Sequence, residues 1–337
     1  MNTPTSSTEF VHFPVMLEEV IKTCCPHKGG VFLDCTFGGG GYSKKLLGFS
    51  NTKVIALDRD EYILNISRDL KKKYFKRFFF HQKKFSEVDT LTKSQSVDAA
   101  IFDLGLSSIQ LKNLDRGFSF KSKKKLDMSM GLTSISAEKV INNFSEKSLK
   151  LIIKILGEEK DASIIAKNII KTRINKEITK VHHLVEIIEK SKKKTFKSKI
   201  NPSTKTFQAL RMFVNKETTE LIQGIIKATK TLKPGGKILV ISFHSIEDKI
   251  VKFFFNNFSS NRSKPSRYLP DEKENNFFLF NKYKNKILTP SSSEILMNPA
   301  SRSAKLRFAV RSKNQFKYPS ELINQFKKFL ELESLNV

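Results

Sequence analysis

Five short apolar runs, each bounded by glycine or charged residues, predict strands that are covered on both faces. They occupy residues 29–35, 53–60, 78–85, 97–105 and 237–245. The first two runs enclose a glycine turn and a helix, which together make a βαβ unit with a right-handed crossover and a parallel sheet. A helix from about Lys216 to Thr231 should end at "LKPGG", because Pro-Gly-Gly forbids its continuation. Another helix is expected to open at Pro14.

The fourth and fifth runs are separated by about 130 residues, whereas one crossover needs roughly 30. Val181, Leu184, Val185 and Ile188 repeat with the spacing of an amphipathic helix, so the extra residues are expected to be helical. The sequence therefore predicts an α/β fold: a doubly wound, mostly parallel, Rossmann-like sheet. Residues 1–113 and 214–337 should form it, with an inserted all-helical subdomain at 114–213. Residues 256–294 are polar and are expected to form a long loop.

Charge changes this picture, because 61 basic against 33 acidic residues give a net charge of +28. Such a chain is expected to bind a polyanion such as nucleic acid. The three cysteines have no metal-ligand or disulfide spacing, which favours a reduced cytoplasmic setting. No apolar run approaches the roughly 20 residues of a membrane span.

Four glycines, Gly38–Gly41, follow the first predicted strand. Glycines here let a ligand approach the main chain, and an acidic residue after the second strand can accept hydrogen bonds from a ribose. Asp58 stands there, so we expect an adenosine-bearing cofactor. The run lacks the G-x-G-x-x-G spacing of dinucleotide sites. Asp34 just before it would repel a pyrophosphate but could face the cationic amino end of S-adenosylmethionine. We therefore expect S-adenosylmethionine, with NAD as the alternative.

Nine ordered blocks between His12 and about Phe308 resemble one protein family. They are "HFPVMLEEV", "DCTFGGGGYS", "ALDRD", "FDLGLSSIQL", "RGFSF", "LDMSM", "NPSTKTFQALRMFVN", "ISFHSIEDKIVK" and "NPASRSAKLR". The chain resembles the MraW family of bacterial methyltransferases, which modify the N4 amino group of a cytidine in small-subunit ribosomal RNA. The resemblance implies a cytoplasmic, S-adenosylmethionine-dependent enzyme. It also implies the P-site cytidine 1402 as target and the 30S subunit or its RNA as partner.

The resemblance also implies a cofactor site. It would comprise Gly40, Gly41, Tyr42, Asp58, Phe85, Asp103 and Gln110. The turn, Asp58 and Asp103 follow from the residue pattern as well, whereas Phe85 and Gln110 come from the resemblance alone. Two positions depart from the family pattern: Tyr42 stands where a histidine is usual, and Gly131 where an acidic residue is usual.

Methyl transfer to the amino group of cytosine needs the nitrogen aligned with the methyl carbon and a hydrogen-bond acceptor beside it. Asp103 is our first candidate for the catalytic acceptor and His244, after the fifth strand, the second. Ser107 or a main-chain carbonyl remains open, because "DLGLSS" lacks the Asp/Asn-Pro-Pro-aromatic motif of many amino-methylating enzymes. No carboxylate cluster calls for a metal.

The target base should leave its stack to reach the methyl donor. We hypothesise that the basic insertion clamps the RNA, and four residues are candidates for phosphate contacts: Arg116, Lys205, Arg211 and Arg302. Two other functions remain open, an NAD-dependent oxidoreductase and a non-catalytic RNA-binding assembly factor. The sequence does not fix the oligomeric state and leaves a homodimer open.

Overall fold

A six-stranded sheet forms the centre of the computed structural model, which describes residues 14–192, 201–261 and 278–336. The strand order is β3-β2-β1-β4-β5-β6, and β6 alone runs antiparallel to its neighbour. The strands are β1 Gly30–Asp34, β2 Thr52–Asp58, β3 Phe78–Gln82, β4 Val97–Asp103, β5 Leu232–Ser242 and β6 Lys305–Val310. The predicted mostly parallel α/β fold is confirmed.

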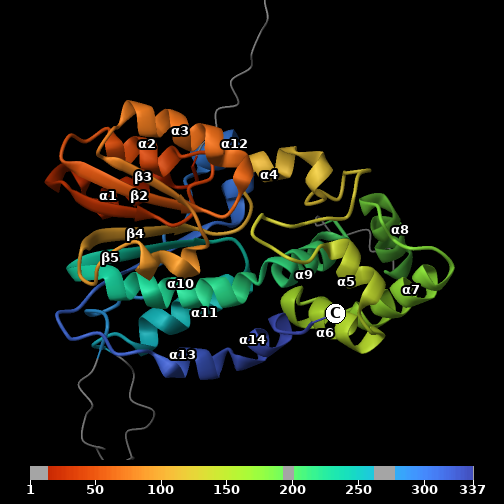
Figure 1. Cartoon of the computed structure of the whole chain (residues 1–337). Coiled ribbons are helices and arrows are strands. Elements are labelled where there is room, and N and C mark those ends of the chain that lie inside the picture. Colours follow the sequence, from red (N-terminus) through yellow and green to blue (C-terminus); the bar gives the residue numbers. More distant parts are fainter. Residues whose placement is uncertain (1–13, 193–200, 262–277, 337) are drawn as a thin grey trace, which may run out of the picture.

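Helices cover both faces of this sheet (Figure 1). One face carries α1 Leu17–Cys24, α2 Gly41–Leu47 and α3 Leu64–Lys73; the other carries α10 Glu217–Thr231 and α11 Ser245–Asn257, with α13 Ser320–Gln325 and α14 Lys327–Glu333 outside them. Successive strand residues point to opposite faces. In β1, accordingly, Phe32 joins the apolar cluster under α1 to α3, and Leu33 joins the cluster under α10 and α11.

A group of helices lies between β4 and α10 in the chain, beside the sheet (Figure 1). They are α5 Ala137–Asn143, α6 Glu146–Leu156, α7 Ala162–Asn175, α8 Val181–Ser191 and α9 Thr204–Asn215. The apolar cluster on the α10 face runs on into these helices without a break. α9 crosses the domain boundary predicted at 213/214, so helices and sheet share one core.

Short elements complete the edge of the sheet where the parallel strands end. They are α4 Ser108–Lys112, α12 Ser292–Met297 and the 3₁₀ helices η2 Glu61–Ile63, η3 Phe85–Thr90, η4 Leu114–Arg116 and η5 Pro299–Ser303. A further 3₁₀ helix, η1 Pro26–Lys28, precedes β1 at the opposite edge. Among the described residues, no helix combines the length and the apolar character that crossing a membrane requires.

Three local predictions need correction or limits. α1 begins at Leu17 rather than Pro14, because Met16 adopts a left-handed conformation that no helix continues through. α10 ends at Thr231 as predicted, but "LKPGG" already belongs to β5 and pairs with β4 across an irregularity in register. In the loop predicted at 256–294, residues 262–277 lie outside the described residues, and the remainder includes α12.

Candidate active site

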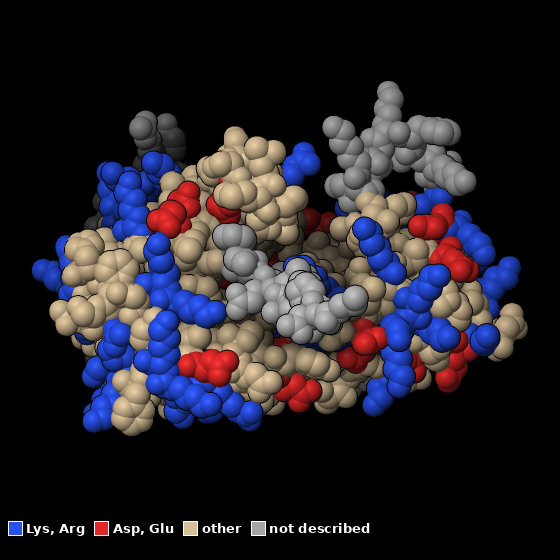
Figure 2. Space-filling model, turned by 90° about the horizontal axis from the view of Figure 1, so that it is seen from above, with Lys and Arg blue, Asp and Glu red and all other residues tan. Residues whose placement is uncertain are grey.

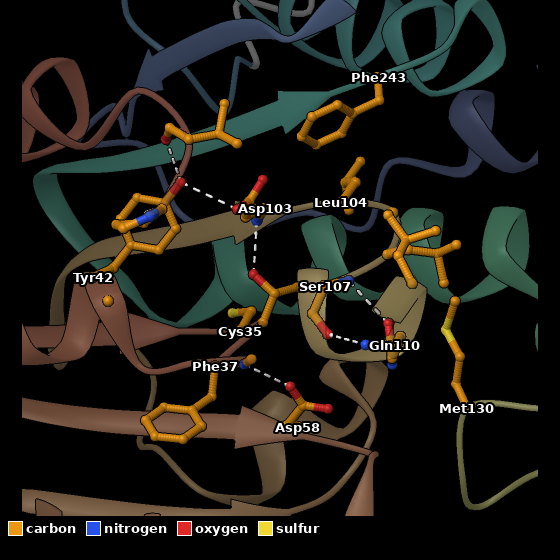
Figure 3. Close-up of a pocket in the computed structure, with 18 of the residues that line it drawn as sticks. Cys35, Phe37, Tyr42, Asp58, Asp103, Leu104, Ser107, Gln110, Met130 and Phe243 are labelled. Carbon is orange, nitrogen blue, oxygen red and sulfur yellow. Dashed lines mark hydrogen bonds between the residues drawn. The ribbon is translucent and has the colours of Figure 1, made fainter. Parts of the chain in front are cut away.

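A cavity of about 430 Å³ opens at the carboxyl ends of β1, β2 and β4. Six of the seven residues predicted to hold the cofactor line it, namely Gly41, Tyr42, Asp58, Phe85, Asp103 and Gln110. Figure 3 shows four of these, Tyr42, Asp58, Asp103 and Gln110, together with Met130 and Phe243. A smaller chamber of about 60 Å³ lies next to the cavity and shares Asp103 and Phe85 with it.

The glycine turn forms one wall of the cavity with its main chain. Gly38 and Gly40 have φ angles of 49° and 73°, in the left-handed region that favours glycine. A Cβ on Gly40 would lie 2.8 Å from the ring of Phe37, and one on Gly41 would lie 2.6 Å from Pro14. Gly40 itself does not line the cavity; it lets the turn close over Phe37. The turn therefore offers a ligand a side-chain-free surface.

Asp58, the last residue of β2, fixes this turn to the next loop. Its Oδ2 accepts a hydrogen bond from the amide of Gly38 at 2.8 Å, and its Oδ1 accepts one from the amide of Asp60 at 2.9 Å. Burial raises the pKa of Asp58 to about 6, against the lowering effect of these two amides. The carboxyl is thus held rigidly at the cavity wall.

Asp60 gathers the neighbouring polar groups into a buried network. Its Oδ2 accepts a hydrogen bond from Nε2 of Gln110 at 2.7 Å and forms an ion pair with Arg116. The buried guanidinium of Arg116 lies 4.7 Å from the ring centre of Tyr62 and 5.2 Å from that of Phe118. The prediction that Arg116 contacts RNA phosphates is therefore wrong, because its guanidinium is buried and paired with Asp60.

Asp103 ends β4, lines the cavity and has one side-chain oxygen without a hydrogen-bond partner among the described residues. The hydroxyl of Tyr42 lies 3.2 Å from Asp103 Oδ2 and 2.5 Å from the main-chain oxygen of Val15. Asp103 Oδ1 is buried and has no hydrogen-bond partner among the described residues. Burial raises the pKa of Asp103 to about 8; the hydrogen bond from Tyr42 lowers it, and nearby carboxylates raise it. A buried acceptor without a partner favours a ligand that donates a hydrogen bond.

Phe85 begins η3 and is half-buried at the side of the cavity that faces α10. Its ring meets Phe102 edge to face at 5.6 Å between ring centres. A Cβ on Gly224 would lie 2.5 Å from the Phe85 ring, so this glycine lets the ring rest directly on α10. Phe85 thus provides a flat apolar support inside the cavity.

The structure corrects the role predicted for Asp34. This carboxyl is fully buried, does not line the cavity, and accepts a hydrogen bond from Ser43 Oγ at 2.7 Å. It therefore holds the first turn of α2 and does not face a cofactor. Gly131, the second departure from the family pattern, has a φ of 62°, and a Cβ there would lie 2.5 Å from the main-chain oxygen of Arg59. An acidic side chain would not fit this conformation.

His244 lies outside the group that lines the cavity. It caps α11, with its Nε2 3.1 Å from Glu247 Oε1. Within the described ranges, His244, Glu247 and Glu217 form a group whose ligand atoms lie within 4.8 Å of one another. Both carboxylate oxygens of Glu217 are, however, already paired with the guanidinium of Arg211, at 2.8 Å each.

The other residues predicted to contact phosphates differ in whether their side chains are exposed or already paired within the protein. Arg211 is tied to Glu217, and Lys205 donates a hydrogen bond to the main-chain oxygen of Glu158 at 3.0 Å. Arg302, in η5, is exposed to solvent. Of the predicted phosphate contacts, only that of Arg302 rests on an exposed side chain.

Several cavity residues escaped the sequence interpretation. Among them are Lys84, Met130, Glu220, Phe243 and Met297. Phe243 belongs to a quoted family block, and Glu220 is a charged residue on the buried side of an amphipathic helix. That second pattern is a signal that could have singled out Glu220.

The cavity fits a ligand that combines an adenosine with a charged group. The glycine turn allows close approach of its polar parts, Phe85 supplies a flat surface, and Asp103 Oδ1 offers a free acceptor. Apolar side chains such as Phe85, Met130 and Phe243 line the cavity together with charged side chains of both signs, among them Asp58, Arg59, Lys84 and Glu220.

Comparison with known proteins gives a consistent match over nearly the whole chain. A family model described as the MraW methylase family matches residues 9–312. A protein from Bartonella grahamii named ribosomal RNA small subunit methyltransferase H is 42% identical over 301 residues, covering 89% of this chain and 90% of the relative. A protein of the same name from Ehrlichia canis is 41% identical over 301 residues, covering 88% and 98% of the two chains.

Solved structures match at low similarity. An rRNA methylase from Streptococcus thermophilus aligns with 87% of this chain and 96% of its own, with a TM-score of 0.38 and 11% identity. A putative methyltransferase from Streptococcus mutans, solved in complex with SAH, covers 89% of this chain and 99% of its own, with a TM-score of 0.39 and 11% identity.

Proposed function

The chain belongs to the MraW methylase family, and on that premise we propose that it methylates the N4 amino group of a cytidine in small-subunit ribosomal RNA, the P-site cytidine 1402. As a methylase of this family it is an enzyme that uses S-adenosylmethionine, so the predicted cofactor is confirmed. The interpretations as an NAD-dependent oxidoreductase or a non-catalytic factor are set aside.

Different residues around the cavity would bind different parts of the cofactor. The main chain of the glycine turn would hold the polar amino acid end, Asp58 would accept hydrogen bonds from the ribose, and Phe85 would support the adenine. Gln110 would form the cavity wall on the adenine side, because a hydrogen bond to Asp60 fixes its side chain. When bound, the cofactor supplies a methyl group that its sulfonium makes electrophilic.

Asp103 is the residue that we propose acts on the accepting nitrogen, and its buried, unpartnered Oδ1 is the observation that carries the proposal. The lone pair of a cytosine amino group is delocalised into the ring. A carboxylate oxygen that accepts a hydrogen bond from this amino group helps to localise the lone pair and takes the proton afterwards. Tyr42 holds the other oxygen of Asp103, so the acceptor is oriented beforehand.

The surface around the cavity suits an RNA strand. Figure 2 shows Lys and Arg on the sheet side and on the helical side of the molecule, separated by a hollow. Cations on both sides can hold a phosphate backbone, while a flipped base enters the hollow. This arrangement supports the proposal that the inserted helices clamp the RNA.

The experiment that tests this function supplies labelled S-adenosylmethionine with assembled small subunits, free small-subunit RNA and DNA in parallel. We expect label in ribosomal RNA alone, and mapping should place it on N4 of cytidine 1402. The Asp103→Asn variant, which lacks the proposed proton acceptor, serves as the control and should transfer less label. Label on another nucleoside, or label in DNA, would contradict the proposed target.

A further inference from the structure

A second buried acceptor lies beside the cavity, on an element that no predicted site residue occupies. Glu220 is on α10, is only 7% exposed, and lines both the cavity and the smaller chamber. Its Oε2 is buried without a hydrogen-bond partner among the described residues. Burying such an oxygen unpaired is costly, so a ligand that donates a hydrogen bond there gains affinity.

The position of Glu220 relative to Phe85 suggests which donor it meets. Glu220 and Gly224 are four residues apart on α10 and therefore share one face of this helix. Gly224 is in turn the residue against which the Phe85 ring rests. Glu220 and Phe85 also line the same two cavities. A planar group that rests on Phe85 would therefore lie in the cavity that Glu220 also lines.

Two cationic side chains lie near this carboxyl. The Nζ of Lys84 lies 3.9 Å from Glu220 Oε1, and Arg59 lines the same two cavities. Oε1 is therefore directed to a cation, and Oε2 is left for the ligand. Glu217, three residues earlier on the same helix, differs in that Arg211 occupies both of its oxygens.

We propose that Glu220 recognises the adenine of the cofactor by accepting a hydrogen bond from its N6 amino group. The carboxylate then rejects a base that carries an oxygen at this position, because two acceptors would face each other. Glu220 is thus a specificity residue for the nucleoside part of the methyl donor. This inference rests on the proposed function only through its cofactor and does not involve the RNA.

Binding without RNA tests the proposal directly. Calorimetry on the full chain measures the affinities of S-adenosylhomocysteine and S-inosylhomocysteine. The first carries an amino group at position 6 of the base, and the second carries an oxygen there. The unaltered protein should prefer the adenine compound roughly 10- to 100-fold, the range of a hydrogen bond to a charged group. Equal affinities would overturn the proposal without any variant.

The Glu220→Gln variant provides the second arm. An amide can accept from an amino group or donate to a carbonyl, so the preference should fall to less than about 3-fold. Glu217→Gln, the matched control, should keep the full preference. If Glu220→Gln weakens both compounds equally, Glu220 only shapes the cavity; if it changes only methyl transfer to RNA, it acts on the target base. Either result overturns the proposal, while the RNA specificity is judged separately by the mapping experiment.

Discussion

The phenol oxygen of Tyr42 lies 3.2 Å from Asp103 Oδ2, at the point where the glycine turn meets the end of β4. This contact fixes one oxygen of the proposed acceptor (Figure 3), whereas the other oxygen is buried without a hydrogen-bond partner among the described residues. Burial is the largest cause of the raised pKa of Asp103.

Asp103→Asn should lower the rate of methyl transfer about 10²- to 10⁴-fold, because an amide cannot take up the proton. Binding of S-adenosylhomocysteine should change only a few-fold. In the unaltered enzyme, burial raises the pKa of Asp103 to about 8, so the acceptor is largely protonated below that pH. Single-turnover rates should therefore rise with pH and level off above about 8.

Ser107→Ala and His244→Gln serve as comparisons for this prediction. Ser107 caps α4 and His244 caps α11, so both variants should retain the rise in rate near pH 8. If Asp103→Asn kept a rate within about 3-fold of the unaltered enzyme while Ser107→Ala lost it, the acceptor would be Ser107 instead.

Tyr42→Phe should shift the same pH profile to higher pH. The hydroxyl of Tyr42 lowers the pKa of Asp103, so removing it lets burial raise this pKa further. The main-chain oxygen of Val15 also loses its partner, which should cost about 1–3 kcal/mol of unfolding free energy. The rate profile and urea unfolding measure the two effects. A shift toward lower pH would show that Tyr42 does not act on Asp103 through this hydrogen bond.

The sequence predicted the groups that depend on strand order alone. Asp58 and Asp103 end parallel strands, whose carboxyl ends meet at one edge, so a pattern of apolar runs was enough to bring them together. Asp34 also ends a strand, but the alternation of side chains points it to the face of Phe32, under α2. The sequence interpretation did not assign faces and therefore misplaced it.

Residues whose roles depend on packing could not be placed in the same way. Arg116 is one of many cations in a chain of net charge +28, and nothing in its sequence neighbourhood shows that it pairs with Asp60 inside the protein. Glu220 reaches the cavity only because Gly224 lets α10 approach Phe85 closely. Such contacts depend on how a distant helix packs, which periodicity alone does not determine.

Arg116→Met should destabilise the protein by about 3–5 kcal/mol, because Asp60 is then buried as an uncompensated charge. The double variant with Asp60→Asn should recover part of this loss, since both charges are removed together. Arg302→Met, at an exposed cation, should change stability by less than about 0.5 kcal/mol and should weaken RNA binding instead. Urea unfolding and RNA titrations distinguish the two arginines.

If the Arg116→Met variant kept its unfolding free energy but bound RNA more weakly, Arg116 would be a phosphate contact after all.

Glu333 on α14 makes the docking of the C-terminal helix sensitive to pH. Its buried carboxyl accepts hydrogen bonds from the amides of Thr218 and Thr219, at the beginning of α10, at 2.9 and 2.8 Å. Burial raises its pKa from 4.5 to about 7, against the lowering effect of these hydrogen bonds.

A carboxyl whose pKa is higher in the folded protein stabilises the fold at low pH, and this contribution is lost as the pH rises from about 4.5 to about 7. The full loss amounts to about 3 kcal/mol. Glu333→Gln cannot ionise and has a single acceptor oxygen, so it loses one of the two amide hydrogen bonds at every pH. The difference in unfolding free energy between this variant and the unaltered chain should therefore move in favour of the variant over that range. Urea unfolding at pH 4.5, 6 and 8 measures it. A difference that stays constant with pH would mean that Glu333 titrates alike in the folded and unfolded chains.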